Sequence, residues 1–207
     1  MDVSFKKPMI KIRPALTNDA KKIAYIKNTT WKDTYKNLID SFYLDNLEIS
    51  QEIINKWKNR ILDTKSNQTY FWVALKSNQV VGFLWGGGAR DPKIEKLKYE
   101  LYAFYVLPKY QHQGIGKKLF STFANNIKKD FFLWMLKDNM SELIYEKLKC
   151  QKTNYENLID IGNKQYKEIA FIYKHKNINQ LDPNCAFCDP SVIEKQGIYK
   201  NGSVVVT

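Results

Sequence analysis

The chain has 207 residues, which suffices for one domain of ordinary size with a small appendage. Hydrophobic residues make up 44% and aromatic residues 14%, so a packed core is expected, and no stretch reaches the roughly 18 uninterrupted apolar residues of a membrane span. The formal charge of +12 comes from lysines spread along the chain, a pattern more typical of solvated surfaces than of a nucleic-acid-binding arm.

Cell compartment follows from the N-terminal residues and the cysteines. The first eight residues lack the apolar segment of a signal peptide, and three cysteines do not form a disulfide framework. We therefore expect a cytoplasmic protein that does not contact a membrane.

The N-terminal part of the chain predicts a short strand followed by helices. Residues 10–13 favour a strand that ends at Pro14, and residues 17–19 can cap a helix that continues through residue 26. A further helix is predicted over residues 50–62, whose apolar side chains fall on one face.

Three strands are predicted in the middle of the chain. Residues 69–75 and 79–86 form a hairpin, and the glycines at 86–88 provide a flexible or bulged exit from it. Residues 100–106 are rich in aromatic and β-branched side chains, and Pro108 ends this strand because proline has no N–H for the ladder.

A glycine-bearing turn then leads directly into a helix over residues 115–127, where apolar side chains recur at helical spacing. The turn consists of Gln111, His112, Gln113, Gly114, Ile115 and Gly116. The first N–H groups of a helix are unpaired, the helix dipole is positive there, and glycine lets a phosphate approach the backbone. With Lys117 and Lys118 in the first helical turn, the segment predicts an anion site, although an ordinary loop relieved by glycines is the alternative.

The last regular elements are a strand over residues 131–136, a helix that ends near residue 148, and a strand over residues 166–174. The last segment alternates polar and apolar side chains, as expected of a strand with one buried face.

These elements and one motif resemble the GNAT superfamily of acetyl-coenzyme A N-acyltransferases. The motif is Gln111-x-x-Gly114-x-Gly116 between a strand and a helix, which is similar to the GNAT signature Gln/Arg-x-x-Gly-x-Gly/Ala. The resemblance covers about residues 9–174. It implies an α/β fold in which a mixed, mostly antiparallel sheet is splayed at its centre and flanked by helices.

A second motif supports the resemblance. Asn139, followed by Tyr145 and the residues Glu-Lys-Leu, is similar to the GNAT pattern Asn…Tyr-Glu-Lys-Leu-Gly-Phe. The chain departs from that pattern at Lys149 and Cys150, where Gly-Phe is usual.

For the cofactor, the resemblance implies acetyl-coenzyme A (acetyl-CoA), with its pyrophosphate wrapped by the turn and no metal required. A backbone N–H near Val106 would hold the oxyanion that develops during acyl transfer. Asn139 would contact the pantetheine arm, or alternatively cap the helix that follows it. The implied cofactor residues are Tyr105, Val106, Gln111, His112, Gln113, Gly114, Ile115, Gly116, Lys117 and Asn139.

Two residues are candidates for acid–base chemistry. An aliphatic amine with a pKa near 10.4 is mostly protonated at neutral pH, so a base must remove a proton before it attacks the thioester. Glu100, eleven residues before Gln111, has the spacing of the GNAT general base; the alternative is a strand carboxylate paired with a lysine such as Lys98. Tyr145 occupies the general-acid position, and its alternative is a half-buried helix aromatic.

The acceptor is an amine of unknown identity. By resemblance Trp31 and Tyr35 would line its site, but core aromatics at helical spacing are an equal alternative. A protein N-terminus, a lysine, a polyamine or a small-molecule amine all remain open, and the chain could act as a monomer or a homodimer.

The C-terminal residues 176–207 predict a separate tail with a short hairpin, after an acetyltransferase domain over residues 1–175. The segment Cys185-Ala-Phe-Cys188 resembles the truncated start of a histidine-triad (HIT) domain, but the chain has only two histidines, so that family's catalytic motif is missing. A zinc site completed by Cys150 and His175 is a weaker alternative to two reduced cysteines.

Three functions are therefore compatible with the sequence. The favoured one is an N-acetyltransferase that moves acetyl from acetyl-CoA to a primary amine by direct attack in a ternary complex. A catalytically idle coenzyme A-binding or regulatory module is the alternative. An RNA-associated protein is third, and a nucleic-acid partner is not expected.

Overall fold

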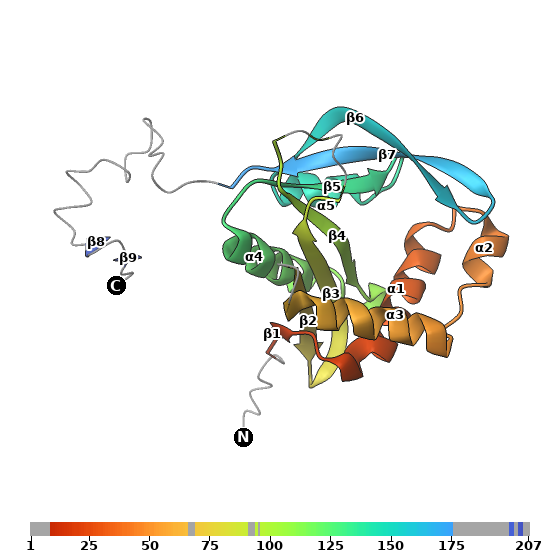
Figure 1. Cartoon of the computed structure of the whole chain (residues 1–207), viewed down its shortest axis with the longest axis horizontal. Helices are drawn as coiled ribbons and strands as arrows, with labels where there is room; N and C mark the ends of the chain where they lie inside the picture. Colours follow the sequence, from red (N-terminus) through yellow and green to blue (C-terminus); the bar gives the residue numbers. More distant parts are fainter. Residues whose placement is uncertain are drawn as a thin grey trace, which may run out of the picture. The chain divides into compact units, whose positions relative to one another are not determined.

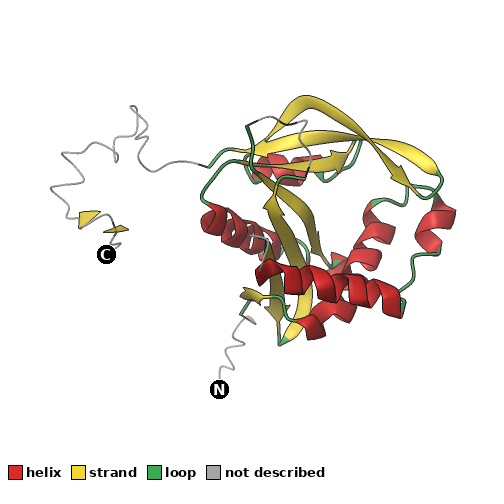
Figure 2. Cartoon of the chain, in the orientation of Figure 1, coloured by secondary structure: helices red, strands yellow, loops and turns green. Residues whose placement is uncertain are grey.

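The computed structural model describes residues 9–65, 69–90, 94 and 96–175, and the backbone of residues 199–200 and 203–204. The chain divides into two units, Met1–His175 and Lys176–Thr207. In the first unit, helices cover both faces of a seven-stranded sheet (Figures 1 and 2).

The elements of the first unit follow the order that the sequence predicts, with one additional long strand, β6. They are β1 (Lys11–Pro14), α1 (Ala20–Thr34), α2 (Ser41–Asp45), α3 (Gln51–Leu62), β2 (Tyr70–Lys76), β3 (Gln79–Gly88), β4 (Tyr99–Val106), α4 (Ile115–Ile127), β5 (Phe131–Leu136), α5 (Glu142–Lys147), β6 (Cys150–Ile161) and β7 (Lys164–Tyr173).

The sheet is split between its fourth and fifth strands. The strand order is β1-β2-β3-β4-β5-β7-β6, and neighbours are antiparallel except β4 and β5, which are parallel. Among the described residues, Glu100 and Phe132 are the one pair that joins β4 to β5, so the rest of β4 diverges from β5 (Figure 1). The predicted mixed, mostly antiparallel sheet with a splayed centre is confirmed.

A bulge in β4 lies beside the split. Trp85 pairs with Ala103 and Gly86 pairs with Leu101, so Tyr102 is the extra residue. An extra residue reverses the alternation of side chains between the two faces of a strand. The second half of β4 therefore presents Phe104 to the α4 face of the sheet.

The glycines at 86–88 do not form the exit from the hairpin that the sequence predicts. β3 continues to Gly88, and its three glycines pair with β4 beyond the bulge. The reason for glycine is close packing: a Cβ on Gly86 would lie 2.5 Å from the ring of Phe123, and one on Gly87 would lie 2.7 Å from the side chain of Thr69.

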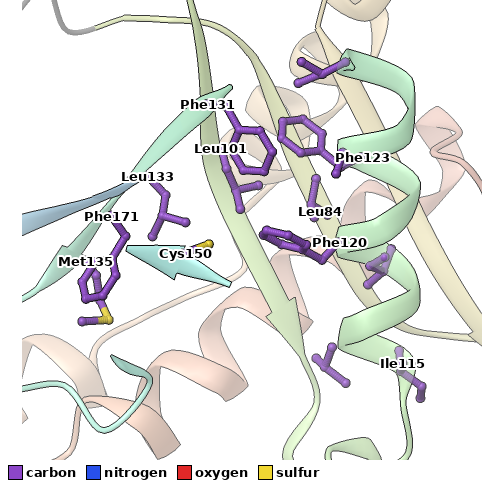
Figure 3. Packing of buried hydrophobic residues seen from close by; sticks show 14 of the residues in the cluster. Leu84, Leu101, Ile115, Phe120, Phe123, Phe131, Leu133, Met135, Cys150 and Phe171 are labelled. Atoms are coloured by element: carbon purple, nitrogen blue, oxygen red, sulfur yellow. The ribbon is translucent and has the colours of Figure 1, made fainter. Parts of the chain in front are cut away.

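Two apolar cores fix the helices on the sheet. On one face Phe120 and Phe123 point from α4 toward Leu101 and Phe131 (Figure 3), and the rings of Phe123 and Phe131 are 5.0 Å apart, edge to face. On the other face α1 and α3 pack against β2–β4 around Trp57. Burial of these side chains provides most of the stabilisation of the unit.

The aromatic side chains between Trp31 and Tyr43 do not lie on one continuous helix. α1 ends at Thr34 and α2 starts at Ser41. Asp40 caps α2 by accepting a hydrogen bond from the N–H of Tyr43, and its own N–H donates to the Tyr166 hydroxyl of β7 at 3.0 Å. Contact with a distant strand thus fixes where the second helix begins.

The second unit is described only in the backbone of β8 (Tyr199–Lys200) and β9 (Ser203–Val204), which pair antiparallel. Cys185, Cys188 and the HIT-like segment lie outside the described residues, and nothing in the structure supports that resemblance. The described part of the chain contains no group of three side chains that could hold a metal, and none of its helices is long and apolar enough to cross a membrane.

Candidate active site

The N-terminus of α4 is open to a ligand. Gly114 is its N-cap residue with φ of 80°, a left-handed conformation that favours glycine, and it provides no capping side chain. The first helical hydrogen bond runs from the N–H of Lys118 to Gly114, so the N–H groups of the preceding helical residues have no partner within the helix. A Cβ on Gly114 would meet no atom within 4 Å, which shows that the space in front of the turn is free.

Gly116 has a different role from Gly114. A Cβ at Gly116 would lie 3.2 Å from the ring of Phe104 on β4. The missing side chain therefore lets the first turn of α4 lie close to β4, where that strand has diverged from β5. This packing places the open helix end beside the split in the sheet.

Gln111 of the signature and the neighbouring Gln113 hold the turn in place. The amide of Gln111 donates to the carbonyl of Val106, the last residue of β4, at 3.0 Å. The amide of Gln113 donates to the carbonyl of Lys109 at 3.1 Å, and the Lys76 ammonium donates to the Gln113 side-chain oxygen. These contacts tie the turn to the end of β4.

Several lysines surround the turn. The ammonium groups of Lys76 and Lys109 lie 5.7 and 5.0 Å from the ring of Tyr110. Both lysines in the first turn of α4 are exposed, and Lys118 donates to the carbonyl of Ile10 at 2.6 Å. The resulting positive field favours a polyphosphate ligand.

Tyr145 packs between the two halves of the sheet. Its ring centre lies 6.5 Å from that of Phe104 on β4 and 5.9 Å from that of Phe171 on β7. Burial raises the pKa of Tyr145 well above its usual range, and the nearby Tyr105 and Cys150 raise it further. The hydroxyl therefore keeps its proton at neutral pH and can donate it.

Asn139 shapes the segment before α5. It is 3% exposed, and its side-chain oxygen accepts a hydrogen bond from the N–H of Ser141 at 2.9 Å. Its side chain also interacts with the hydroxyl of Tyr35. The N-cap residue of α5 is Ser141, so Asn139 fixes the turn before the helix rather than capping it, and its interaction with Tyr35 places it beside the site.

Trp31 of α1 and Tyr35, which directly follows α1, lie beside β4 at this site. The indole N–H of Trp31 donates to the hydroxyl of Tyr105 at 2.9 Å, and the rings of Trp31 and Tyr35 lie 5.1 Å apart. Burial raises the pKa of Tyr35, with further contributions from Tyr105 and Tyr145, so the three hydroxyl groups are close in space. The structure thus brings together four predicted site residues, which come from α1 and the residue after it, β4 and α5.

One carboxylate near this cluster has no sequence signal. Glu168 lies on β7 opposite Leu136, the last residue of β5, and is half-buried. Its charge contributes to the raised pKa values of Tyr35 and Tyr105. It occupies an ordinary polar position of an alternating strand, and only the docking of β7 beside β5 brings it to the tyrosines.

Glu100 does not join the cluster. It is 2% exposed and bound to Arg90: its two carboxylate oxygens accept from Nη2 at 2.5 Å and Nε at 3.2 Å, and one also accepts from the backbone N–H at 2.9 Å. It sits at the closed end of the split, six residues from Val106 or about 20 Å along the strand. This geometry argues against Glu100 as the general base, and its partner is Arg90 rather than Lys98.

Comparison with known proteins agrees with this architecture. Residues 67–149 match the family model of the acetyltransferase (GNAT) domain. Over 166 residues the chain is 29% identical to the uncharacterized N-acetyltransferase YuaI of Bacillus subtilis, covering 78% of this chain and 91% of that protein. Over 111 residues it is 28% identical to a spermidine N(1)-acetyltransferase of Thermoplasma acidophilum, covering 53% of this chain and 65% of that protein.

Solved structures share the fold at lower identity. The PaiA N-acetyltransferase of Thermoplasma acidophilum in complex with coenzyme A superposes with a TM-score of 0.60 at 21% identity, over 80% of this chain and 99% of that one. YncA of Salmonella typhimurium with acetyl-CoA gives 0.60 at 15% identity, over 82% and 95%. With the sheet order and its split, these similarities show the GNAT acyl-CoA N-acyltransferase fold.

Proposed function

We propose that this chain, whose residues 67–149 match the acetyltransferase (GNAT) domain model, moves an acetyl group from acetyl-CoA to a primary amine by direct attack in a ternary complex. One observation carries the proposal: the open N-terminus of α4 lies beside the split, with the protonated Tyr145 packed between the two halves of the sheet. The groups proposed to bind the phosphates and to donate a proton therefore lie in the same part of the molecule.

The residues present fit coenzyme A. The unpaired N–H groups at Gly114–Lys117 and the free space at Gly114 suit a pyrophosphate, and lysines surround the turn. The backbone of Tyr105 and Val106 borders the split, where an extended amide-bearing arm could pair with a strand edge. The co-substrate supplies the thioester carbonyl that an amine attacks.

Tyr145 is assigned to protonate the departing thiolate. Its raised pKa keeps the hydroxyl protonated at working pH, so it can donate to the sulfur as negative charge develops there while the C–S bond breaks. The developing oxyanion is assigned to the backbone N–H near Val106.

We assign the task of receiving the amine to Glu168 rather than Glu100. Glu168 contributes to the electrostatics of Tyr35 and Tyr105, and a carboxylate at this place can orient an incoming ammonium and accept its proton, directly or through water. Trp31 and Tyr35 would form the wall of the acceptor site.

The test measures release of free thiol from acetyl-CoA with a panel of amines, together with thermal unfolding. At a hundredfold excess over Kd, acetyl-CoA should stabilise the fold by about 2.7 kcal/mol. Gly114→Val should abolish this shift, because a β-branched residue strains a left-handed backbone and fills the space in front of the turn.

Gly88→Val is the matched control, because a Cβ there also meets open space, but without a left-handed backbone. Undiminished binding by the Gly114→Val protein would refute the pyrophosphate assignment. Binding of acetyl-CoA without transfer to any amine would instead indicate the catalytically idle module.

A further inference from the structure

Three cationic side chains gather over aromatic rings on the α1–α3 side of the sheet. The Lys27 ammonium lies 3.5 Å from the ring centre of Trp31. The Arg60 guanidinium lies 4.6 and 5.0 Å from the rings of Trp57 and Trp85. On the far side of this group Arg90 lies 6.0 Å from Trp85 and 4.0 Å from Tyr102.

Two of these cations lack charge compensation. Arg90 is paired with Glu100, but burial and then the charge of Arg60 lower the pKa of Lys27 to about 8. Burial and then Arg90 lower the pKa of Arg60. No carboxylate of the described residues is among the causes of either lowered pKa. Like charges held together in a partly desolvated place favour a bound anion.

This cationic cluster, Lys27 with Arg60, adjoins the acceptor side of the candidate active site. α1 and α3 run next to each other (Figure 1), and Lys27 covers the same Trp31 whose indole donates to Tyr105. The indole N–H of Trp85 is buried and finds no partner among the described residues, so a further donor lies under Arg60. An acceptor whose amine reaches Tyr145 would extend toward these groups.

Building on the proposed function, we propose that the acceptor is an amine that also carries a carboxylate or phosphate group, bound by Lys27 and Arg60. Glu168 would receive the amine end and the cationic cluster the anionic end. A polyamine, which is positive along its whole length, should be a poor acceptor. This differs from the spermidine named for one of the similar enzymes.

Matched acceptors test the inference, each pair differing in one anionic group: lysine against cadaverine, and phosphoethanolamine against ethanolamine. We expect kcat/KM to favour the anionic member of at least one pair by about tenfold or more, since a hydrogen bond to a charged partner contributes on that scale. The pair that responds distinguishes carboxylate from phosphate.

Arg60→Met and Lys27→Met should each reduce this preference about tenfold, because kcat/KM for the anionic acceptor falls relative to that for its neutral or cationic partner. Lys22→Met is the control: it removes the same charge from α1, where Lys22 lies 4.5 Å from the ring of Tyr25, away from Trp31. The affinity for acetyl-CoA, measured for each variant, confirms an intact fold.

Binding of the same amines to the coenzyme A-loaded protein, measured by calorimetry, gives a readout that does not depend on turnover. The inference would be overturned if the protein bound the acceptor without the anionic group more tightly in both pairs. It would also be overturned if the preference for the anionic acceptor persisted in both Arg60→Met and Lys27→Met. The proposed function fails separately, if no amine releases thiol in the presence of acetyl-CoA.

Discussion

At the scale of single residues, Tyr145 has the clearest kinetic signature. Tyr145→Phe should lower kcat by about 10²- to 10⁴-fold and leave the Kd of acetyl-CoA unchanged, because only the transition state uses the hydroxyl proton. Tyr155→Phe is the control, since Tyr155 is an exposed tyrosine on β6. Full turnover by the Tyr145→Phe enzyme would show that water or the acceptor supplies the proton.

The pH profile follows from the same group. Because the pKa of Tyr145 is raised, the acid form persists as pH rises through 10, whereas the free-amine fraction of an aliphatic acceptor grows over that range. The rate should therefore increase from pH 7 to 10 with no alkaline decline from Tyr145.

Glu100→Gln should affect stability more than turnover. Its buried carboxylate accepts three hydrogen bonds from Arg90, and weakening them should lower the free energy of unfolding by about 1–3 kcal/mol in a denaturant titration. Glu142→Gln, which breaks a partly exposed pair with Lys152, should cost at most about 1 kcal/mol. A large loss of kcat at unchanged stability would restore Glu100 as the base.

Local patterns indicated some residues of the candidate site and gave no signal for others. Gly114 and Tyr145 could be identified from short motifs near the start of a helix, because the residues that define each motif are close together in the sequence. Glu168 lies on β7, the last strand of the sheet in chain order. The role of Glu100 is set by its pairing with Arg90, which is ten residues away in a region without a motif. The position of a carboxylate along one strand does not show which cationic side chain it will pair with in the folded protein.

At the scale of elements, the contact between β3 and α4 depends on one glycine. Gly86→Ala would place a Cβ 2.5 Å from Phe123 and 2.7 Å from the carbonyl of Glu100, so it should lower the free energy of unfolding by about 1–3 kcal/mol. A smaller side chain in Phe123→Leu should relieve part of this cost, and Gly88→Ala should change stability little. Additive effects of Gly86→Ala and Phe123→Leu would contradict direct contact.

The longest strand shows why part of the fold escaped prediction. β6 is rich in polar residues and mostly exposed, so its sequence lacks the alternation that marks a half-buried strand. It forms a strand because its backbone hydrogen-bonds to β7. This tertiary pairing outweighs the local conformational preference of its residues. Strands β2 to β5, which have buried side chains, were predicted nearly to their ends.

At the scale of the whole molecule, the first unit should be self-sufficient. We propose that residues 1–175 form the acetyltransferase domain, and the end of this unit is anchored where Asp130 accepts from Lys174 and from the N–H of His175, both at 2.9 Å. A protein ending at His175 should keep the melting temperature of the first unit and the Kd of acetyl-CoA.

A protein ending at Gln165 provides the contrast. It lacks most of β7, which lies between β5 and β6, and should not fold. Loss of cofactor binding on removal of residues 176–207 alone would contradict the proposed boundary.

The split sheet also bears on how this protein behaves without its co-substrate. Its outer edge strands are poor templates for aggregation: β1 is short and ends in Pro14, and β6 carries charged side chains and an irregular register between Lys152 and Glu156. The two inner edges, along β4 and β5 beyond Glu100, lack these protections. Bound coenzyme A would cover these inner edges. The protein without coenzyme A should therefore self-associate on storage more than the coenzyme A-bound protein.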